Sequence, residues 1–156
     1  MNDQTTASPA YYLKGLAPLY ASLDDLAWAA LRVATGVLLL PHGAQKLFGM
    51  FGGGGLSGTA EFLGKVGYSA PDFLALMIGL VEVVGGLFLA LGLWTQPAAL
   101  AIAIFMANAV LFHLPNGFFW TAKGFEYPLL WGMLALFFAV KGGGAYSLDR
   151  KLTREF

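Results

Sequence analysis

Residues 73–94 read FLALMIGLVEVVGGLFLALGLW, and this stretch decides the fold. A helix that crosses a bilayer core needs roughly 20 apolar residues, and this stretch supplies them with Glu82 as its single charged side chain. Stripes of small residues are where membrane helices pack closely. The residues at steps of three and four from Glu82 form such a stripe: Ala75, Gly79, Gly86 and Ala90. We therefore expect a transmembrane helix whose Glu82 faces other helices.

Three further stretches are apolar enough to be membrane spans, at residues 26–48, 97–114 and 125–140. Pro41 in the first of them removes a backbone hydrogen bond and predicts a kink beside His42. The whole chain is 58% hydrophobic and 12% charged, whereas a soluble domain is about 25% charged. Only Thr95 and Gln96 separate the second and third spans, so these spans must be antiparallel. The sequence predicts an all-α protein, a four-helix transmembrane bundle over residues 26–141.

The segments outside the bundle carry an uneven distribution of positive charge. An even number of spans puts both termini on one side, and five basic residues lie on that side: Lys14, Lys141, Arg150, Lys151 and Arg154. Lys65 and Lys123 lie on the other side, so the positive-inside rule predicts cytoplasmic termini. Residues 1–25 are rich in Tyr and Leu and are predicted to be an interfacial or a flexible segment. Residues 142–156 are predicted to be a solvated cytoplasmic tail.

Several polar residues lie within the predicted spans, where a charged side chain costs about 2.5 to 3.5 kcal/mol. Because the spans alternate in direction, most of them arrive at the outer half of the bundle. We expect Arg32 and Glu82 to form a buried ion pair, because a paired charge avoids the cost of an isolated one. The alternative is that the ions only hold helices together, or extend to the interface. The other polar residues toward the outer ends are His42, Gln45, Lys46, Asn108, His113 and Glu126.

Other classes of site and function are disfavoured by the sequence. The chain has no cysteine, so disulfides and thiolate metal sites are excluded. Its formal net charge of zero gives no basic field for nucleic acid. Residues 53–58, GGGLSG, match a dinucleotide-binding pattern, but a predicted membrane helix precedes them where that site needs a strand. These glycines instead predict a flexible turn or a re-entrant loop. Haem or copper at His42 and His113 is disfavoured, because paired histidines near a membrane surface are more often interfacial side chains.

The combined motifs resemble the DoxX family of small four-helix membrane proteins. They include an arginine early in the first span, HGAQKLFG at residues 42–49, a glutamate in the second span, EYP at residues 126–128 and a closing GGGAYSLD. The resemblance covers roughly residues 26–150. It implies a bacterial inner-membrane, multi-pass protein that is similar to the membrane subunit of thiosulfate:quinone oxidoreductase.

From these residues and this resemblance we expect the membrane subunit of a quinone-linked oxidoreductase complex, with a polar cavity that opens to the outer side. His42 and Glu126 would exchange protons with the ligand, and Lys46 would stabilise an anionic form of it. Gln45, Asn108 and His113 would provide hydrogen bonds. Two alternatives stay open, a small-molecule or proton-coupled transporter and a structural accessory subunit without catalysis. The expected partners are the lipid bilayer, a redox protein, a small-molecule ligand and a second copy of the chain.

Overall fold

The computed structural model describes residues 12–152, which contain helices and no strand. The predicted all-α class is therefore confirmed for the described residues. The α-helices are α1 (Ala17–Val37), α2 (Leu40–Phe48), α3 (Gly55–Lys65), α4 (Pro71–Leu80), α5 (Gly86–Leu91), α6 (Thr95–His113), α7 (Glu126–Lys141) and α8 (Leu148–Lys151). A π-helical turn, η3 (Val81–Gly85), joins α4 to α5, and the short 3-10 turns are η1 (Lys14–Leu16), η2 (Met50–Gly52), η4 (Leu114–Asn116) and η5 (Trp120–Ala122).

Two continuous helical segments in the described part of the chain are long and apolar enough to cross a membrane. They are Pro71–Leu91, which joins α4, η3 and α5, and Thr95–Asn116, which joins α6 and η4. Only 28% and 22% of their most apolar windows are buried, and large apolar side chains such as Phe73, Leu87 and Ile104 are exposed, as lipid-facing residues would be. The first predicted span is divided between α1 and α2, and α7 has 16 residues. The four-helix transmembrane bundle therefore stays a prediction.

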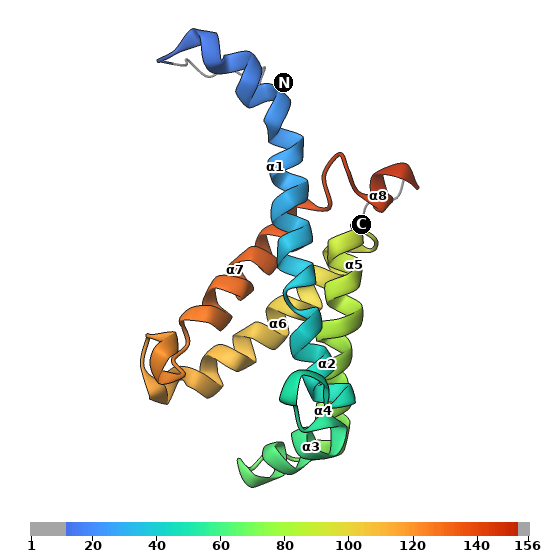
Figure 1. The fold of residues 1–156 in the computed structure, drawn as a ribbon, viewed down its shortest axis with the longest axis vertical. Helices are drawn as coiled ribbons and strands as arrows, with labels where there is room; N and C mark the ends of the chain where they lie inside the picture. The colour runs from blue at the N-terminus through green and yellow to red at the C-terminus, as the bar shows by residue number, and fades with distance from the viewer. Residues whose placement is uncertain (1–11, 153–156) are drawn as a thin grey trace, which may run out of the picture.

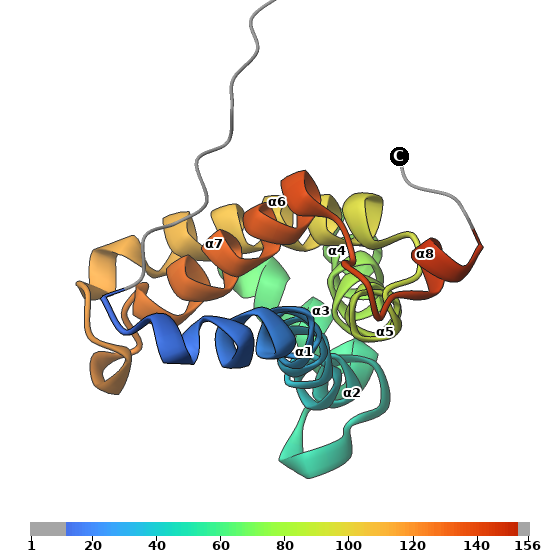
Figure 2. The same ribbon diagram turned by 90° about the horizontal axis from the view of Figure 1, so that it is seen from above.

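The helices form two groups that diverge toward one end of the molecule (Figure 1). In the first group α1 packs against α5, while α2 and α3 pack against α4. In the second group α6 and α7 form an antiparallel hairpin that runs at a steep angle to α4 and α5 (Figures 1 and 2). The start of α1 and the short helix α8 lie at one end of the molecule, and α3 lies at the opposite end (Figure 1).

Glycines let the first group pack at backbone contact. A Cβ added at Gly36 would lie 2.3 Å from the Gly86 carbonyl oxygen, and one at Gly79 would lie 2.3 Å from the Leu47 side chain. Ala75, Gly79 and Gly86 are buried, and Glu82 is only 3% exposed. The predicted inward orientation of Glu82 and its small-residue stripe is therefore confirmed.

The break between α1 and α2 lies one turn before Pro41. Residues 38–39 form a turn, and Pro41 occupies the first turn of α2. A proline lacks the N–H that would bond to the carbonyl four residues earlier, and its ring clashes with that carbonyl, here Val37. The helix is thus interrupted just before Pro41, where a kink was predicted, and α2 packs against α4.

The structure describes part of each terminal segment, and only the C-terminal one differs from the sequence prediction. Residues 14–25 of the N-terminal segment are helical, as η1 and the first turns of α1. Ser147 and Asp149 are 1% and 6% exposed, so the prediction of a solvated tail is wrong for these residues. Residues 1–11 and 153–156, including Arg154, lie outside the described residues.

Candidate functional site

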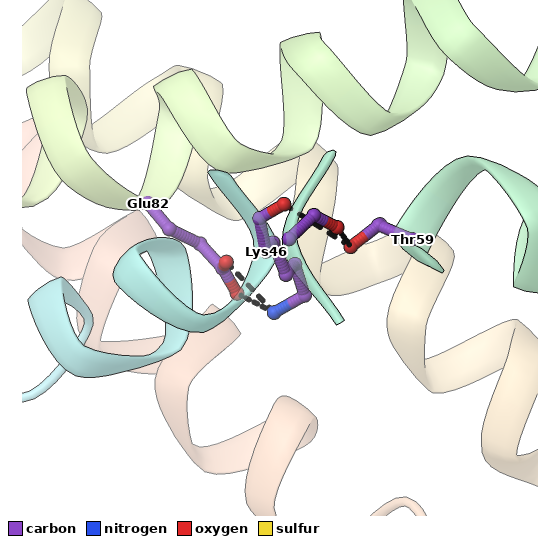
Figure 3. A network of polar contacts seen from close by, with 4 residues as sticks. Lys46, Thr59 and Glu82 are labelled. Carbon is purple, nitrogen blue, oxygen red and sulfur yellow. Dashed lines mark hydrogen bonds and ion pairs between the residues drawn. The ribbon is translucent and has the colours of Figure 1, made fainter. Parts of the chain in front are cut away.

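Lys46 and Glu82 form an ion pair between α2 and the π-helical turn η3 (Figure 3). The Lys46 Nζ donates to both carboxylate oxygens of Glu82, at 2.7 Å each. The Glu82 side chain is 4% exposed and that of Lys46 is 30% exposed. A charge-assisted pair of this geometry leaves the carboxylate neutralised, whereas one N–H of the lysine remains available.

The backbone around the pair is adapted to bring the two side chains together. Glu82 lies in η3, and single π-helical turns inside α-helices are frequent at functional sites. On the opposite helix, a Cβ at Gly43 would lie 3.0 Å from the Glu82 Cβ, so only glycine allows this approach. Lys46 is also tied to α3, because the Thr59 Oγ1 donates to the Lys46 carbonyl oxygen at 3.2 Å (Figure 3).

The ion pair borders a cavity of about 820 Å³ between the two helix groups. Ligand pockets for small organic molecules have volumes of about 300 to 1,000 Å³ and mainly apolar walls. The walls of this cavity are mainly aliphatic and aromatic side chains of α4, α6 and α7. Its polar lining side chains include His42, Lys46, Thr59, Glu82, Asn108 and His113.

Three of these polar side chains have hydrogen-bonding capacity to spare. Within residues 12–152, the side chains of His42 and Asn108 have no hydrogen-bond partner. The His113 Nδ1 lies 2.7 Å from the Lys123 carbonyl oxygen, which can only accept, so Nδ1 must be the donor. In the neutral imidazole the Nε2 of His113 is then an acceptor. The cavity therefore offers both donors and acceptors to a ligand.

Helix α3 closes the cavity at the end where the two helix groups diverge. Phe62 of α3 and Phe112 of α6 both line the cavity, and their rings meet edge to face with centroids 5.9 Å apart. The sequence predicted a flexible turn or a re-entrant loop for the glycine-rich segment. The structure instead forms a helix from Gly55 onward, which packs on α4 through Ala60, Leu63 and Ala75.

The predicted ion pair between Arg32 and Glu82 is wrong. The Arg32 Nη1 donates to the carbonyl oxygens of Leu89 and Ala90, at 3.1 and 3.0 Å, and its Nη2 donates to that of Tyr146 at 2.8 Å. The reason is register, because α1 and α5 are antiparallel and Arg32 lies opposite the end of α5. Glu82 lies in η3, which packs against α2, so the side chain of Lys46 reaches it.

A second set of residues, which we call the Arg32 cluster, joins the C-terminal segment to this end of the molecule. It comprises Arg32, Gly92, Thr95, Ser147 and Asp149. Asp149 accepts from the backbone N–H groups of Trp94 and Thr95 and from the Thr95 hydroxyl, at 2.7, 2.9 and 2.6 Å, and it interacts electrostatically with Arg32. These bonds satisfy free N–H groups at the start of α6.

Sequence reasoning missed the Arg32 cluster, although one local signal was present. Ser147 followed three residues later by Arg150 places a capping side chain before a short helix, and the Ser147 Oγ accepts from the Arg150 N–H at 3.1 Å. That pattern indicates a folded segment instead of a solvated tail. Nothing in the pattern identifies α6 as the element that Asp149 contacts.

Two of the predicted site residues do not line the cavity. The Gln45 side chain donates to the Phe51 carbonyl oxygen at 3.2 Å. Glu126 accepts from the Trp120 N–H at 3.0 Å and so holds the loop before α7. Each of these side chains therefore bonds to the backbone of a neighbouring loop. Over residues 12–152, no cluster of three or more His, Asp or Glu side chains could hold a metal ion.

Comparison with known proteins places these features in a family. The sequence pattern of the DoxX family matches residues 27–114. An uncharacterized protein of Haemophilus influenzae is 34% identical over 135 residues, which are 81% of this chain and 91% of that protein. CatD of Bacillus subtilis, named provisionally as an oxidoreductase, is 30% identical over 76% of this chain and 81% of its own length.

A third relative bears on location. The Escherichia coli inner membrane protein YqjF is 29% identical over 140 residues, which are 86% of this chain and 98% of that protein. No solved structure matches the chain.

Proposed function

Because this chain belongs to the DoxX family of membrane proteins, we propose that it is the membrane subunit of a quinone-linked oxidoreductase complex. In this proposal the cavity beside Lys46 and Glu82 holds the quinone. The protein lies in the bacterial inner membrane as four spans, with both termini in the cytoplasm and the α3 end facing outward. The inner-membrane name of the Escherichia coli relative supports the location, and the name of CatD supports the reaction class.

The cavity is the observation that carries the proposal. A quinone has a flat ring with two carbonyl oxygens and an apolar substituent, so its site needs donors at one end and apolar walls elsewhere. The cavity of about 820 Å³ fits this description, because polar side chains from α2, η3 and α6 border walls that are otherwise mainly apolar. When bound, a quinone supplies electron and proton transfer that the side chains of this chain do not supply by themselves.

The residues that line the cavity have separate roles in this proposal. His42 exchanges protons with the ligand, since its imidazole has no other hydrogen-bond partner within residues 12–152. Asn108 and the Lys46 ammonium donate hydrogen bonds, and the His113 Nε2 accepts one. Glu82 holds Lys46 in place. Glu126 and Gln45 are not part of this set, because their side chains bond to loops.

A redox partner protein is required, since the chain has no cysteine to relay electrons. We propose that this partner docks on the outer side or within the membrane plane and exchanges electrons with the quinone in the cavity.

The direct test is quinone binding by the purified protein in lipid nanodiscs. A decyl-substituted benzoquinone should bind saturably, and His42→Ala should weaken it. Glu61→Gln is the matched control, because Glu61 forms an exposed ion pair with Lys65 outside the cavity. Absence of saturable binding, or equal binding by wild type and His42→Ala, would contradict the proposal.

A second candidate function is a proton-coupled transporter, and the position of Glu82 favours it. Glu82 is a buried carboxylate near the middle of the membrane-spanning segment Pro71–Leu91, and such residues often mark proton pathways. Proteoliposome flux of a small solute that depends on a proton gradient, and that is lost in Glu82→Gln, would favour this candidate over the oxidoreductase.

A further inference from the structure

The charges that border the cavity cancel one another. Among residues 12–152, Lys46 and Glu82 are the only Lys, Arg, Asp or Glu residues that line the cavity. The other ionisable lining side chains are His42, His113, Tyr68 and Tyr127. Both carboxylate oxygens of Glu82 are taken by the Lys46 ammonium at 2.7 Å. The polar end of the cavity therefore offers hydrogen bonds without an uncompensated positive charge.

The rest of the cavity is suited to an apolar chain. Leu74, Met77 and Ile78 of α4 face it from one group of helices, and Ile104, Phe105 and Trp131 face it from the α6–α7 hairpin. Burying an apolar chain against such walls is favourable in proportion to the area removed from water. The neutral polar end and the apolar walls are parts of one continuous space.

We infer that the cavity selects amphiphiles with an uncharged polar head and rejects anionic ones, and that Glu82 sets this selectivity by neutralising Lys46. This inference rests on the proposed function, because it names the charge class of the ligand held in the same cavity. An anionic head placed beside the pair would lose its hydration and gain no free cation, and burying an unpaired charge is strongly unfavourable. Specificity in this site then depends partly on the desolvation cost of a charged competitor.

The inference changes the role of Lys46. The sequence predicted that Lys46 stabilises an anionic form of the ligand. In the structure the Lys46 ammonium is already paired with the Glu82 carboxylate, so it acts toward a ligand as a hydrogen-bond donor. Removing the carboxylate should release the charge and convert the site into one that prefers anions.

The test compares probes with the same apolar chain and different heads. Decyl-benzoquinone, decanol and decanoate are titrated into the protein in nanodiscs of uncharged lipid, and binding is followed by tryptophan fluorescence and by calorimetry. Trp131 lines the cavity and serves as the local reporter. Wild type should bind decyl-benzoquinone and decanol at least about tenfold more tightly than decanoate.

Variants of the pair decide whether Glu82 is the cause. Glu82→Gln should raise decanoate affinity at least about tenfold relative to decanol, because Lys46 is then unpaired. The double variant Lys46→Met with Glu82→Gln should restore the neutral preference, which controls for changes in shape. Lys46→Met alone leaves the carboxylate unpaired, so it should bind decylammonium and reject decanoate, and it keeps the test decisive if Glu82→Gln does not fold. Glu61→Gln should leave all three affinities unchanged.

Each outcome bears on the inference. Wild type that binds decanoate as tightly as decanol overturns it, as does a Glu82→Gln protein with the wild-type ratio. Quinone binding without charge selectivity would overturn this inference and leave the proposed function standing. Binding of decanol without binding of the quinone would support the inference and contradict the proposed function. If no probe binds, both are overturned.

Discussion

Arg32 and the ion pair of Lys46 with Glu82 lie at different levels of the first helix group, and their charges are stabilised in different ways. The guanidinium of Arg32 is 2% exposed and donates to three backbone carbonyls, with Asp149 nearby. The pair of Lys46 and Glu82 is also hydrogen-bonded, but its lysine side chain is 30% exposed and borders the cavity. The Arg32 cluster leaves no room for a ligand, whereas the Lys46–Glu82 pair has a cavity beside it.

This comparison shows that a buried ion in a membrane protein does not by itself identify a functional site. What distinguishes the two is the space around them, since the Nε of Arg32 is itself buried without a hydrogen-bond partner within residues 12–152. At the Arg32 cluster, the close contact of Gly92 fills the space, since a Cβ there would lie 2.1 Å from the Arg32 Nη1. Beside Lys46, the unpartnered side chains of His42 and Asn108 border an open volume. The first arrangement is typical of folding and the second of binding.

The largest effect should come from removing the arginine. Arg32→Ala leaves the Leu89, Ala90 and Tyr146 carbonyls without their charged donor, so we expect a loss of about 3–5 kcal/mol in the free energy of unfolding. Thermal unfolding in detergent measures it. Arg150→Ala, which changes an exposed side chain, is the control and should unfold as wild type does.

A smaller loss is expected where backbone contact is broken. Gly36→Ala places a Cβ 2.3 Å from the Gly86 carbonyl oxygen, so α1 and α5 must move apart at an expected cost of about 1–3 kcal/mol. The matched control is Gly58→Ala in α3, where no heavy atom lies within 4 Å of the added carbon. That variant should be as stable as wild type or more so by up to about 1 kcal/mol, because alanine favours helix. Equal melting temperatures of the two variants would disprove the close contact.

Glu82→Gln tests the contrast between the two buried charges. It leaves the Lys46 ammonium without a carboxylate, but water or a ligand in the cavity can still bond to it, so the expected loss is about 1–2 kcal/mol. The loss should therefore be clearly smaller than for Arg32→Ala under the same detergent conditions. If Glu82→Gln is the more destabilising variant, the cavity does not reach the ion pair.

The smallest effect on folding is expected at His42. His42→Ala removes a side chain that has no hydrogen bond within residues 12–152, so thermal unfolding should not change. Quinone affinity should fall about 2- to 10-fold, the value of one hydrogen bond. A protein that loses stability and retains affinity would assign His42 to the fold and would weaken the proposed site.

Several features of the fold and the site could be predicted because they depend on local patterns. The stripe of small residues around Glu82 predicted its inward orientation, and Pro41 predicted the break between α1 and α2. His42, Lys46, Asn108 and His113 were predicted from their placement on apolar helices. These inferences need only helix periodicity, the missing N–H of proline and the cost of charge in lipid.

The partners of these residues could not be predicted in the same way. The sequence predicted Arg32 as the partner of Glu82, although Lys46 is a second positive charge in the predicted spans, and that prediction was wrong. The choice depends on how far α1 and α2 are shifted along α4 and α5, and no local pattern encodes that shift. The close contacts of Gly36 with Gly86 and of Gly43 with Val83 determine this shift between the helices.

By itself, the sequence determined that the chain is helical and suited to a membrane, and which faces of its helices turn inward. Only the tertiary structure decided that Lys46 binds Glu82, that Arg32 binds the C-terminal segment, and that the angle between the helix groups leaves a cavity. The physical reason is that helix formation and burial follow from residues a few positions apart. Ion pairs and cavities depend on helix register and crossing angle, which the whole set of packing contacts determines together.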